Sequence, residues 1–71
     1  MNKINPKKLL GSKWTAVTPS NKEKHFLVTD VEFDEEELVI GCSIEVVISK
    51  RSMSINWHDL KNASNWIHGW K

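Results

Sequence analysis

The residues of this 71-residue chain that could carry out chemistry are few, and their spacing argues against a reactive centre. A metal site needs three or four ligands, and no two histidines stand three to five residues apart in the sequence. Cys42 lies in an alternating apolar run, where a free cysteine is expected to be buried and unreactive. The candidates set aside on these grounds are His25, Cys42, His58 and His68. We therefore predict no metal and no cofactor.

Carboxylates are abundant, but they are crowded into one short stretch. The segment from Asp30 to Glu37 contains six of the nine acidic residues and is expected to end in an exposed loop, which would leave its carboxylates without fixed positions. A serine, a histidine and an aspartate occur close together at Ser54, His58 and Asp59, but spacing alone makes no catalytic triad. The sequence contains no glycine-rich phosphate loop. We predict that the protein is not an enzyme.

The four tryptophans are the most informative side chains. Trp14 and Trp57 fall on the apolar faces of expected strands, which predicts that both pack in the core. Trp66 and Trp70 stand among polar residues near the end of the sequence, where they either dock on the sheet or form a partly exposed aromatic surface. With the cations of an expected turn, they make the candidate partner-binding set: Trp66, Trp70, Lys50 and Arg51.

Two kinds of partner fit such a surface. A protein or peptide partner is favoured, with the acidic loop steering a basic one. The alternative is single-stranded RNA, whose bases would stack on tryptophan while cations hold the phosphates. The net charge is only +1, although residues 1–24 contain six lysines and one acidic residue, Glu23. Cations gathered beside the tryptophans would favour RNA, and an acidic loop beside them would oppose it.

Alternation of apolar residues predicts the elements that position these groups. Strands are expected over residues 13–18, 25–33 and 38–49, and a further strand over residues 52–57 forms a hairpin with the third. The third strand has one wholly apolar face, with Gly41 predicting a bulge or bend within it. The second strand is expected to be apolar on both sides at its start, where Phe26 and Val28 lie on one face, and on one side at its end. Its other face is Leu27, Thr29, Val31 and Phe33, and the apolar face of the third strand is Leu38, Ile40, Cys42, Ile44, Val46 and Ile48.

The spacing of apolar residues changes to three or four after Trp57, which predicts a helical lid over residues 58–70 ended by Gly69. Residues 1–12 form a basic arm anchored by Leu9 and Leu10, and residues 13–71 form one small domain. The expected fold is mostly β: a small antiparallel SH3-like barrel, or alternatively a curled meander sheet with a helix packed on it.

The cysteine content and the lack of long apolar stretches in the sequence predict the cellular location. A small secreted domain usually has several cysteine pairs, whereas this chain has one cysteine. No apolar stretch has the length of a signal peptide or a membrane span. We expect a cytoplasmic protein with no membrane partner, and the oligomeric state stays open.

Several short segments occur together in a specific order: residues 5–10, residues 12–19 from Ser12 to Pro19, residues 22–26, residues 49–52, and the ending with Trp66, Gly69, Trp70 and Lys71. In this order they resemble a bacterial family of small tryptophan-rich proteins that is catalogued as a domain of unknown function. The similarity covers nearly the whole chain and implies no catalytic or binding residues.

Overall fold

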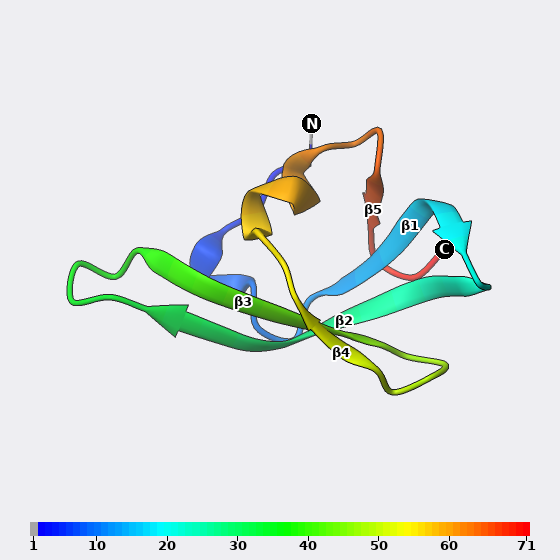
Figure 1. The fold of residues 1–71 in the computed structure, drawn as a ribbon. Helices are drawn as coiled ribbons and strands as arrows, with labels where there is room; N and C mark the ends of the chain where they lie inside the picture. Colours follow the sequence, from blue (N-terminus) through cyan, green and yellow to red (C-terminus); the bar gives the residue numbers. More distant parts are fainter. Residues whose placement is uncertain (1) are drawn as a thin grey trace.

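The structure is a computed structural model that describes residues 2–71, so Met1, the first residue of the expected arm, lies outside the described residues. Most of the regular secondary structure is β-strand, as predicted (Figure 1). The strands are β1 (Lys13–Ser20), β2 (Glu23–Phe33), β3 (Val39–Val46), β4 (Ser52–Ser54) and β5 (Trp66–His68), and two 3-10 turns are η1 (Pro6–Lys8) and η2 (Trp57–Lys61).

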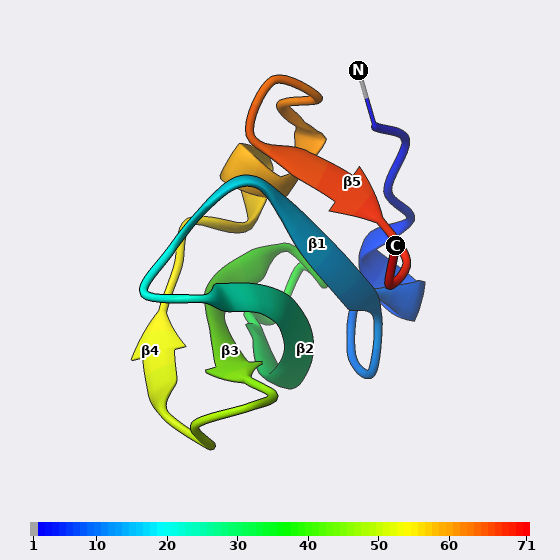
Figure 2. The ribbon, with the colours of Figure 1, turned by 90° about the vertical axis from the view of Figure 1, so that its right-hand side faces the viewer.

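The five strands form one antiparallel sheet in the order β4-β3-β2-β1-β5. Its twist curls the sheet, and Figure 2 shows the two edge strands, β4 and β5, on opposite sides of the opening. Because β4 and β5 do not pair with each other, the sheet is not closed into a barrel. Of the two expected architectures, the open curled sheet is the one observed.

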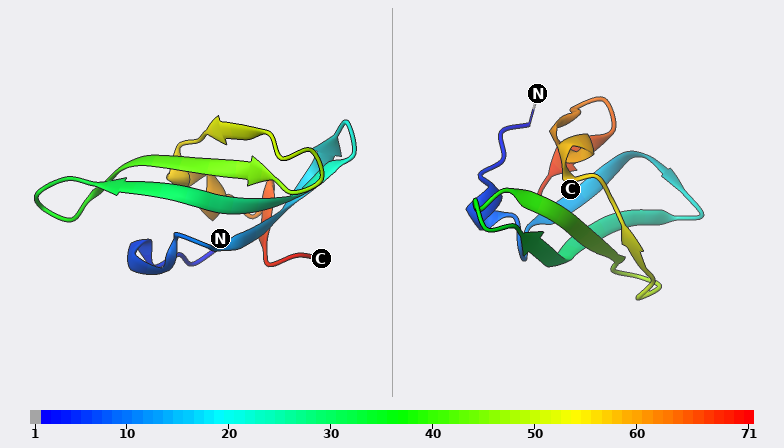
Figure 3. Two further views of the ribbon diagram at one scale, coloured as in Figure 1. Left: turned by 90° about the horizontal axis from the view of Figure 1, so that it is seen from below. Right: turned by 60° about the vertical axis from the view of Figure 1, so that its left-hand side comes forward.

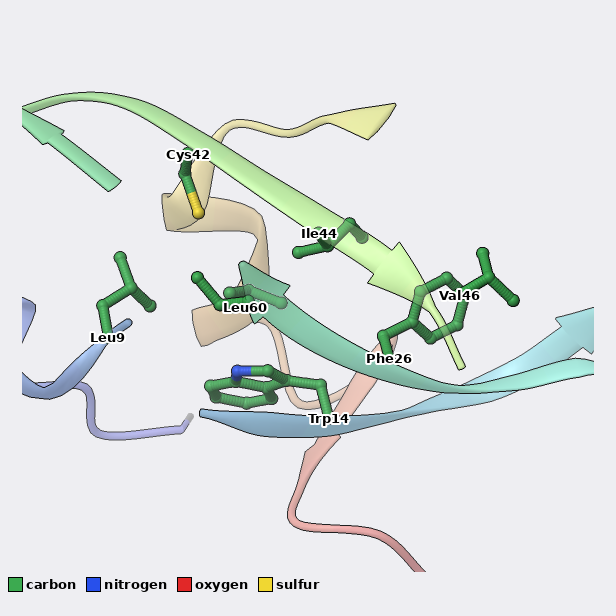
Figure 4. Close-up of a cluster of buried hydrophobic side chains, with 8 residues drawn as sticks. Leu9, Trp14, Phe26, Cys42, Ile44, Val46 and Leu60 are labelled. Carbon is green, nitrogen blue, oxygen red and sulfur yellow. The ribbon is translucent and has the colours of Figure 1, made fainter. Parts of the chain in front are cut away.

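Side chains from both ends of the chain fill the inside of the curl (Figure 4). Trp14 is fully buried, stacks on His68 with ring centroids 4.6 Å apart, and donates its indole N–H to Ser12 Oγ at 2.8 Å. We call the side of the sheet that bears Trp14 and Phe26 the inner face. The buried apolar residues are Leu9, Trp14, Phe26, Val28, Cys42, Ile44, Val46 and Leu60.

The expected inward faces of β2 and β3 are only partly correct, because two bulges shift the alternation. Thr29 is an extra residue on β2, so Phe26 and Val28 point inward before it and Val31 after it. On β3 the irregularity falls at Ile40, next to the glycine expected to mark it, and leaves Ile40 65% exposed while Val39 packs on the core. A one-residue shift moves every following side chain to the other face.

The helical lid expected over residues 58–70 is wrong beyond its first part. The turn η2 buries Leu60 and is capped by Asn56, whose side-chain oxygen accepts the His58 N–H. Residues 66–68 are instead a strand that pairs with β1. The open edge of β1 provides backbone partners 50 residues away, and this pairing satisfies more hydrogen bonds than an isolated helical turn.

The N-terminal segment lies against the body of the protein. Leu9 is fully buried, whereas Leu10 is 62% exposed, so one of the two expected anchors enters the core. The side chain of Asn2 donates to the carbonyl oxygens of Leu60 and Trp66 at 2.9 and 2.8 Å. These contacts cover part of the outer edge of β5 and leave β4 as the more open edge.

Candidate functional site

A groove of about 530 Å³ lies at the opening of the curled sheet, between β4 on one side and β1 and β5 on the other. Ligand pockets commonly have volumes of about 300–1,000 Å³. Its lining comes from every strand: Ala16, Thr18, Ser20, Glu23, Phe26, Ile44, Arg51, Met53, Ser54, Ile55, Asn65 and Trp66. We refer to it as the edge groove.

The floor of the edge groove is the outer layer of the core. Phe26 and Ile44 are buried beneath it, and Met53 and Ile55 are half-buried along one wall. Trp66 forms the other wall and meets Phe26 edge to face, with ring centroids 5.0 Å apart. The floor is therefore apolar and is held in place by core packing, while hydroxyl and amide groups line the rim.

The β4 wall carries backbone groups that the sheet leaves unused. The Ile55 N–H donates to the Cys42 carbonyl, and the Val46 N–H donates to the Arg51 carbonyl. Every second residue pair of an antiparallel ladder is hydrogen-bonded, so the Met53–Ile44 pair between these two is hydrogen-bonded as well. Ser52 and Ser54 occupy the intervening positions, which point their N–H and C=O groups away from β3. The sequence predicted this strand but not the unpaired edge, which depends on how far the sheet closes.

A β1 distortion opens the facing wall. Thr15 pairs with His25, and the next pair is Ser20 with Glu23, so the intervening residues of β1 leave the β2 ladder. Val17 donates its N–H to Asn65 instead. This departure separates β1 from β2 between these two pairs, and Ala16, Thr18 and Ser20 of this part of β1 line the edge groove.

The turn end of the edge groove carries a set of charges. Arg51 pairs with Glu23 at 2.5 Å, and Ser49 donates to the other oxygen of that carboxylate at 3.2 Å. The Glu23 side chain is only 12% exposed, whereas that of Arg51 is 58% exposed. Lys22 and Lys50 lie exposed in the two adjoining turns. Three cations against one carboxylate leave this end positive.

The four candidate residues do not form one surface. Trp66 and Arg51 both line the edge groove, and Lys50 precedes Arg51 in the same turn. Trp70 lies on the other side of the sheet, because it contacts Lys13 and His25, which alternate with the inward-facing Trp14 and Phe26. Gly69, with φ +89°, turns the chain between the two tryptophans.

Trp70 is held on the outer face by specific contacts. Its indole N–H donates to the Phe26 carbonyl at 3.0 Å, the Lys13 ammonium lies 4.8 Å from its ring centroid, and 43% of the residue is exposed. The neighbouring Lys71 N–H donates to Thr15 Oγ1. Trp14 is core, as expected, and Trp57 is half-buried against the core with Lys61 over its ring.

The acidic loop is remote from the edge groove. Residues 34–38 form the tip of the β2–β3 hairpin, at the opposite end of the molecule from the β1–β2 and β3–β4 turns (Figures 1 and 3). The longest dimension of the fold is 38 Å. Glu37 lies near Lys7, with 3.9 Å between carboxylate oxygen and ammonium nitrogen. The loop does not border the residues that line the groove.

The cysteine and the possible metal ligands are not arranged as a reactive site in the part of the chain that the structure describes. Cys42 is 6% exposed, and burial, helped by the Asp30 carboxylate, raises the pKa of its thiol. Among residues 2–71, no three His, Cys, Asp or Glu side chains are placed to hold a metal ion. The same residues include no helix long and apolar enough to cross a membrane.

These features define a class: a small, open antiparallel sheet with one tryptophan buried in its core and, at its edge, a groove with an apolar floor and a polar rim. The chain belongs to the tryptophan-rich protein family DUF2389, a family of unknown function, whose model matches residues 12–71. No curated protein and no solved structure matches the chain. The matched range includes every strand of the sheet and all residues that line the edge groove.

Proposed function

We propose that the protein is a non-enzymatic binding module of the bacterial cytoplasm that accepts an extended protein or peptide segment in the edge groove. The carrying observation is the combination of an open strand edge at β4 with an apolar floor beside it. An added strand pairs its backbone with the outward N–H and C=O groups of Ser52 and Ser54. Its alternate side chains then reach the floor formed by Phe26 and Ile44.

The geometry of the opening suits one strand. A segment in the groove lies between β4 and the part of β1 that has left the β2 ladder. Such a segment would complete the closed SH3-like arrangement expected from the sequence. Main-chain hydrogen bonds supply affinity in this mode, and the pockets for alternate side chains supply selectivity.

A single-residue substitution tests strand addition directly. Ser54→Pro removes an outward N–H while leaving the Ile55–Cys42 bond of the ladder intact, and proline is tolerated at a strand edge. Ser54→Ala is the matched control, because it loses the hydroxyl and keeps the N–H. Both variants are first checked for the native fold by circular dichroism and thermal unfolding.

The probe is a displayed library of random dodecapeptides selected on the wild-type chain. Peptides recovered from it are expected to bind Ser54→Ala as the wild type and to bind Ser54→Pro about tenfold more weakly, since an unmade buried hydrogen bond costs about 1–3 kcal/mol. Recovered peptides that bind the folded Ser54→Pro variant equally well would contradict strand addition. Failure to recover any peptide would contradict the proposed function.

Single-stranded RNA is the second candidate, and one observation favours it: a half-exposed Trp70 with the Lys13 ammonium over its ring on the outer face. Three observations weigh against it. Arg51 is paired with Glu23, the Trp66 ring packs on Phe26, and the two tryptophans lie on different faces. Fluorescence anisotropy of a labelled twelve-residue oligouridine tests it, with Trp70→Ala expected to abolish any binding.

A further inference from the structure

We infer that the edge groove selects an acidic peptide: an extended segment whose alternate apolar side chains are followed, at the end that reaches the turns, by aspartate or glutamate. This inference rests on the proposed function and gives the chemistry of its partner. It reverses the sign expected from the sequence, where the acidic loop was to steer a basic partner.

The first step is the position of the charges. The acidic loop, which could attract a basic segment, lies at the far tip of the β2–β3 hairpin (Figure 3). Its Glu37 is also near Lys7 rather than near any residue of the groove. With a screening length of about 8 Å at physiological salt, carboxylates at that distance exert little attraction at the groove.

The second step is the charge at the turn end itself. Among residues 2–71, Glu23 is the one acidic residue that lines the groove, and Arg51 and Ser49 already occupy its oxygens. Lys22 and Lys50 are exposed and do not line the groove, but each is the sequence neighbour of a lining residue, Glu23 and Arg51 respectively. A basic peptide side chain would meet two exposed lysines and an arginine here, whereas a carboxylate would meet the two lysine ammonium groups and the part of Arg51 that Glu23 does not occupy.

The third step is the backbone that presents the two lysines. Lys22 has φ 62° and Lys50 has φ 61°, the left-handed region where glycine or asparagine is usual in a tight turn. Asparagine at these positions keeps the turn geometry and removes only the charge. The double variant Lys22→Asn/Lys50→Asn is therefore expected to fold as the wild type does.

The partner's register follows from the groove. Apolar side chains two residues apart fall on the same side of a strand, so two of them cover the floor between Met53 and Trp66. The residue that continues past Met53 toward Arg51 reaches the turn end. A carboxylate there lies at the end of the groove that the two turns adjoin, and its expected partners are the Lys22 and Lys50 ammonium groups and the outer part of the Arg51 guanidinium.

The test reads the sequences recovered from the random dodecapeptide library on the wild-type chain and on two variants with the same change in net charge. Lys22→Asn/Lys50→Asn removes the lysines of the two turns beside the groove, and Lys3→Asn/Lys8→Asn removes two exposed lysines of the N-terminal segment. The wild type and the N-terminal control are expected to enrich aspartate and glutamate at one end of an alternating apolar motif. The groove variant is expected to lose that enrichment.

Synthetic peptides then give the magnitude. A recovered peptide is compared with versions in which its acidic residues are replaced by glutamine or by lysine. Binding is expected to fall about tenfold with lysine and less with glutamine, and to weaken as salt is added only for the acidic version. Equal binding of all three would overturn the inference and leave the proposed function standing. Recovery of no peptide, or of peptides insensitive to Ser54→Pro, would overturn both.

Discussion

Trp66 of β5 and Phe26 of β2 meet edge to face, with ring centroids 5.0 Å apart, where the core meets the edge groove. One side of this contact belongs to the hydrophobic core, and the other faces the opening between the edge strands. The same pair therefore stabilises the fold and shapes the candidate site. Variants that change binding without changing stability must therefore be placed on the β4 edge or in the turns. Stability is best tested at tryptophans other than Trp66.

Trp14→Phe is expected to lower the free energy of unfolding by about 1–3 kcal/mol, because it shortens a fully buried side chain and removes the bond to Ser12. Urea unfolding followed by circular dichroism measures the change. Trp70→Phe is the control at a half-exposed site and is expected to cost less. A larger loss for Trp70→Phe than for Trp14→Phe would contradict the placement of the core.

Iodide quenching separates the tryptophans by exposure. Trp14 is 0% exposed and Trp70 is 43% exposed, so Trp70→Phe is expected to reduce the quenchable part of the emission, whereas Trp14→Phe is expected to reduce the resistant part. Titration of the native protein and of both variants with potassium iodide measures these fractions. Unchanged quenching in Trp70→Phe would place that indole inside the protein.

Cys42 is expected to make stability fall at alkaline pH. Burial raises the pKa of the folded-state thiol above 9.0, so the unfolded state releases this proton first as the pH rises. The contribution is fully present below about pH 9 and is lost progressively as the pH rises toward the folded-state pKa. Unfolding of the wild type is compared with that of Cys42→Ala between pH 7 and 10, where lysine titration is common to both. An equal pH dependence would contradict the prediction.

Local alternation predicted the hairpin of residues 38–57, the buried cysteine and the core tryptophan of β1, because these depend on which side of a strand a residue occupies. It failed where the chain responds to a distant partner. The extra residue at Thr29 shifts the inward face of β2, and the pairing of β5 with β1 replaces the expected helix. Such pairings depend on how distant strands meet when the sheet curls, and the local pattern of apolar residues carries no information about that.

The candidate site was predicted in part for the same reason. Trp66 and Arg51 come from positions 15 residues apart in the sequence and do share the edge groove. Trp70 was assigned to the same surface by proximity in sequence, but the turn at Gly69 carries it to the outer face. The groove residues from β1 and β4 were missed, since they become a site only when the two sheet edges face each other.

Gly69 and Gly41 are expected to respond differently to alanine. Gly69 has φ +89°, so Gly69→Ala forces a strained backbone and is expected to cost about 1–2 kcal/mol. At Gly41 an added Cβ would lie 3.4 Å from Glu32 Oε2, the end of a flexible side chain that can move aside. Gly41→Ala is therefore expected to unfold close to the wild-type urea concentration. A loss for Gly69→Ala no larger than that for Gly41→Ala would contradict the strain expected from the positive φ at Gly69.

The Arg51–Glu23 pair is expected to show a measurable coupling energy of about 0.5–1 kcal/mol in a double-mutant cycle of Arg51→Gln and Glu23→Gln. The carboxylate is largely shielded, at 12% exposure, but the 58% exposed arginine side chain lets solvent screen the pair.

Lys7 and Glu37 provide the control: both side chains are more than three-quarters exposed, and 3.9 Å separates their charged atoms, so their coupling should be near zero. Urea unfolding at low and high salt measures both cycles. The Arg51–Glu23 coupling should weaken as salt is added, because part of the pair faces water. Coupling of equal size in the two cycles would mean that the groove holds Glu23 no more firmly than an open surface does.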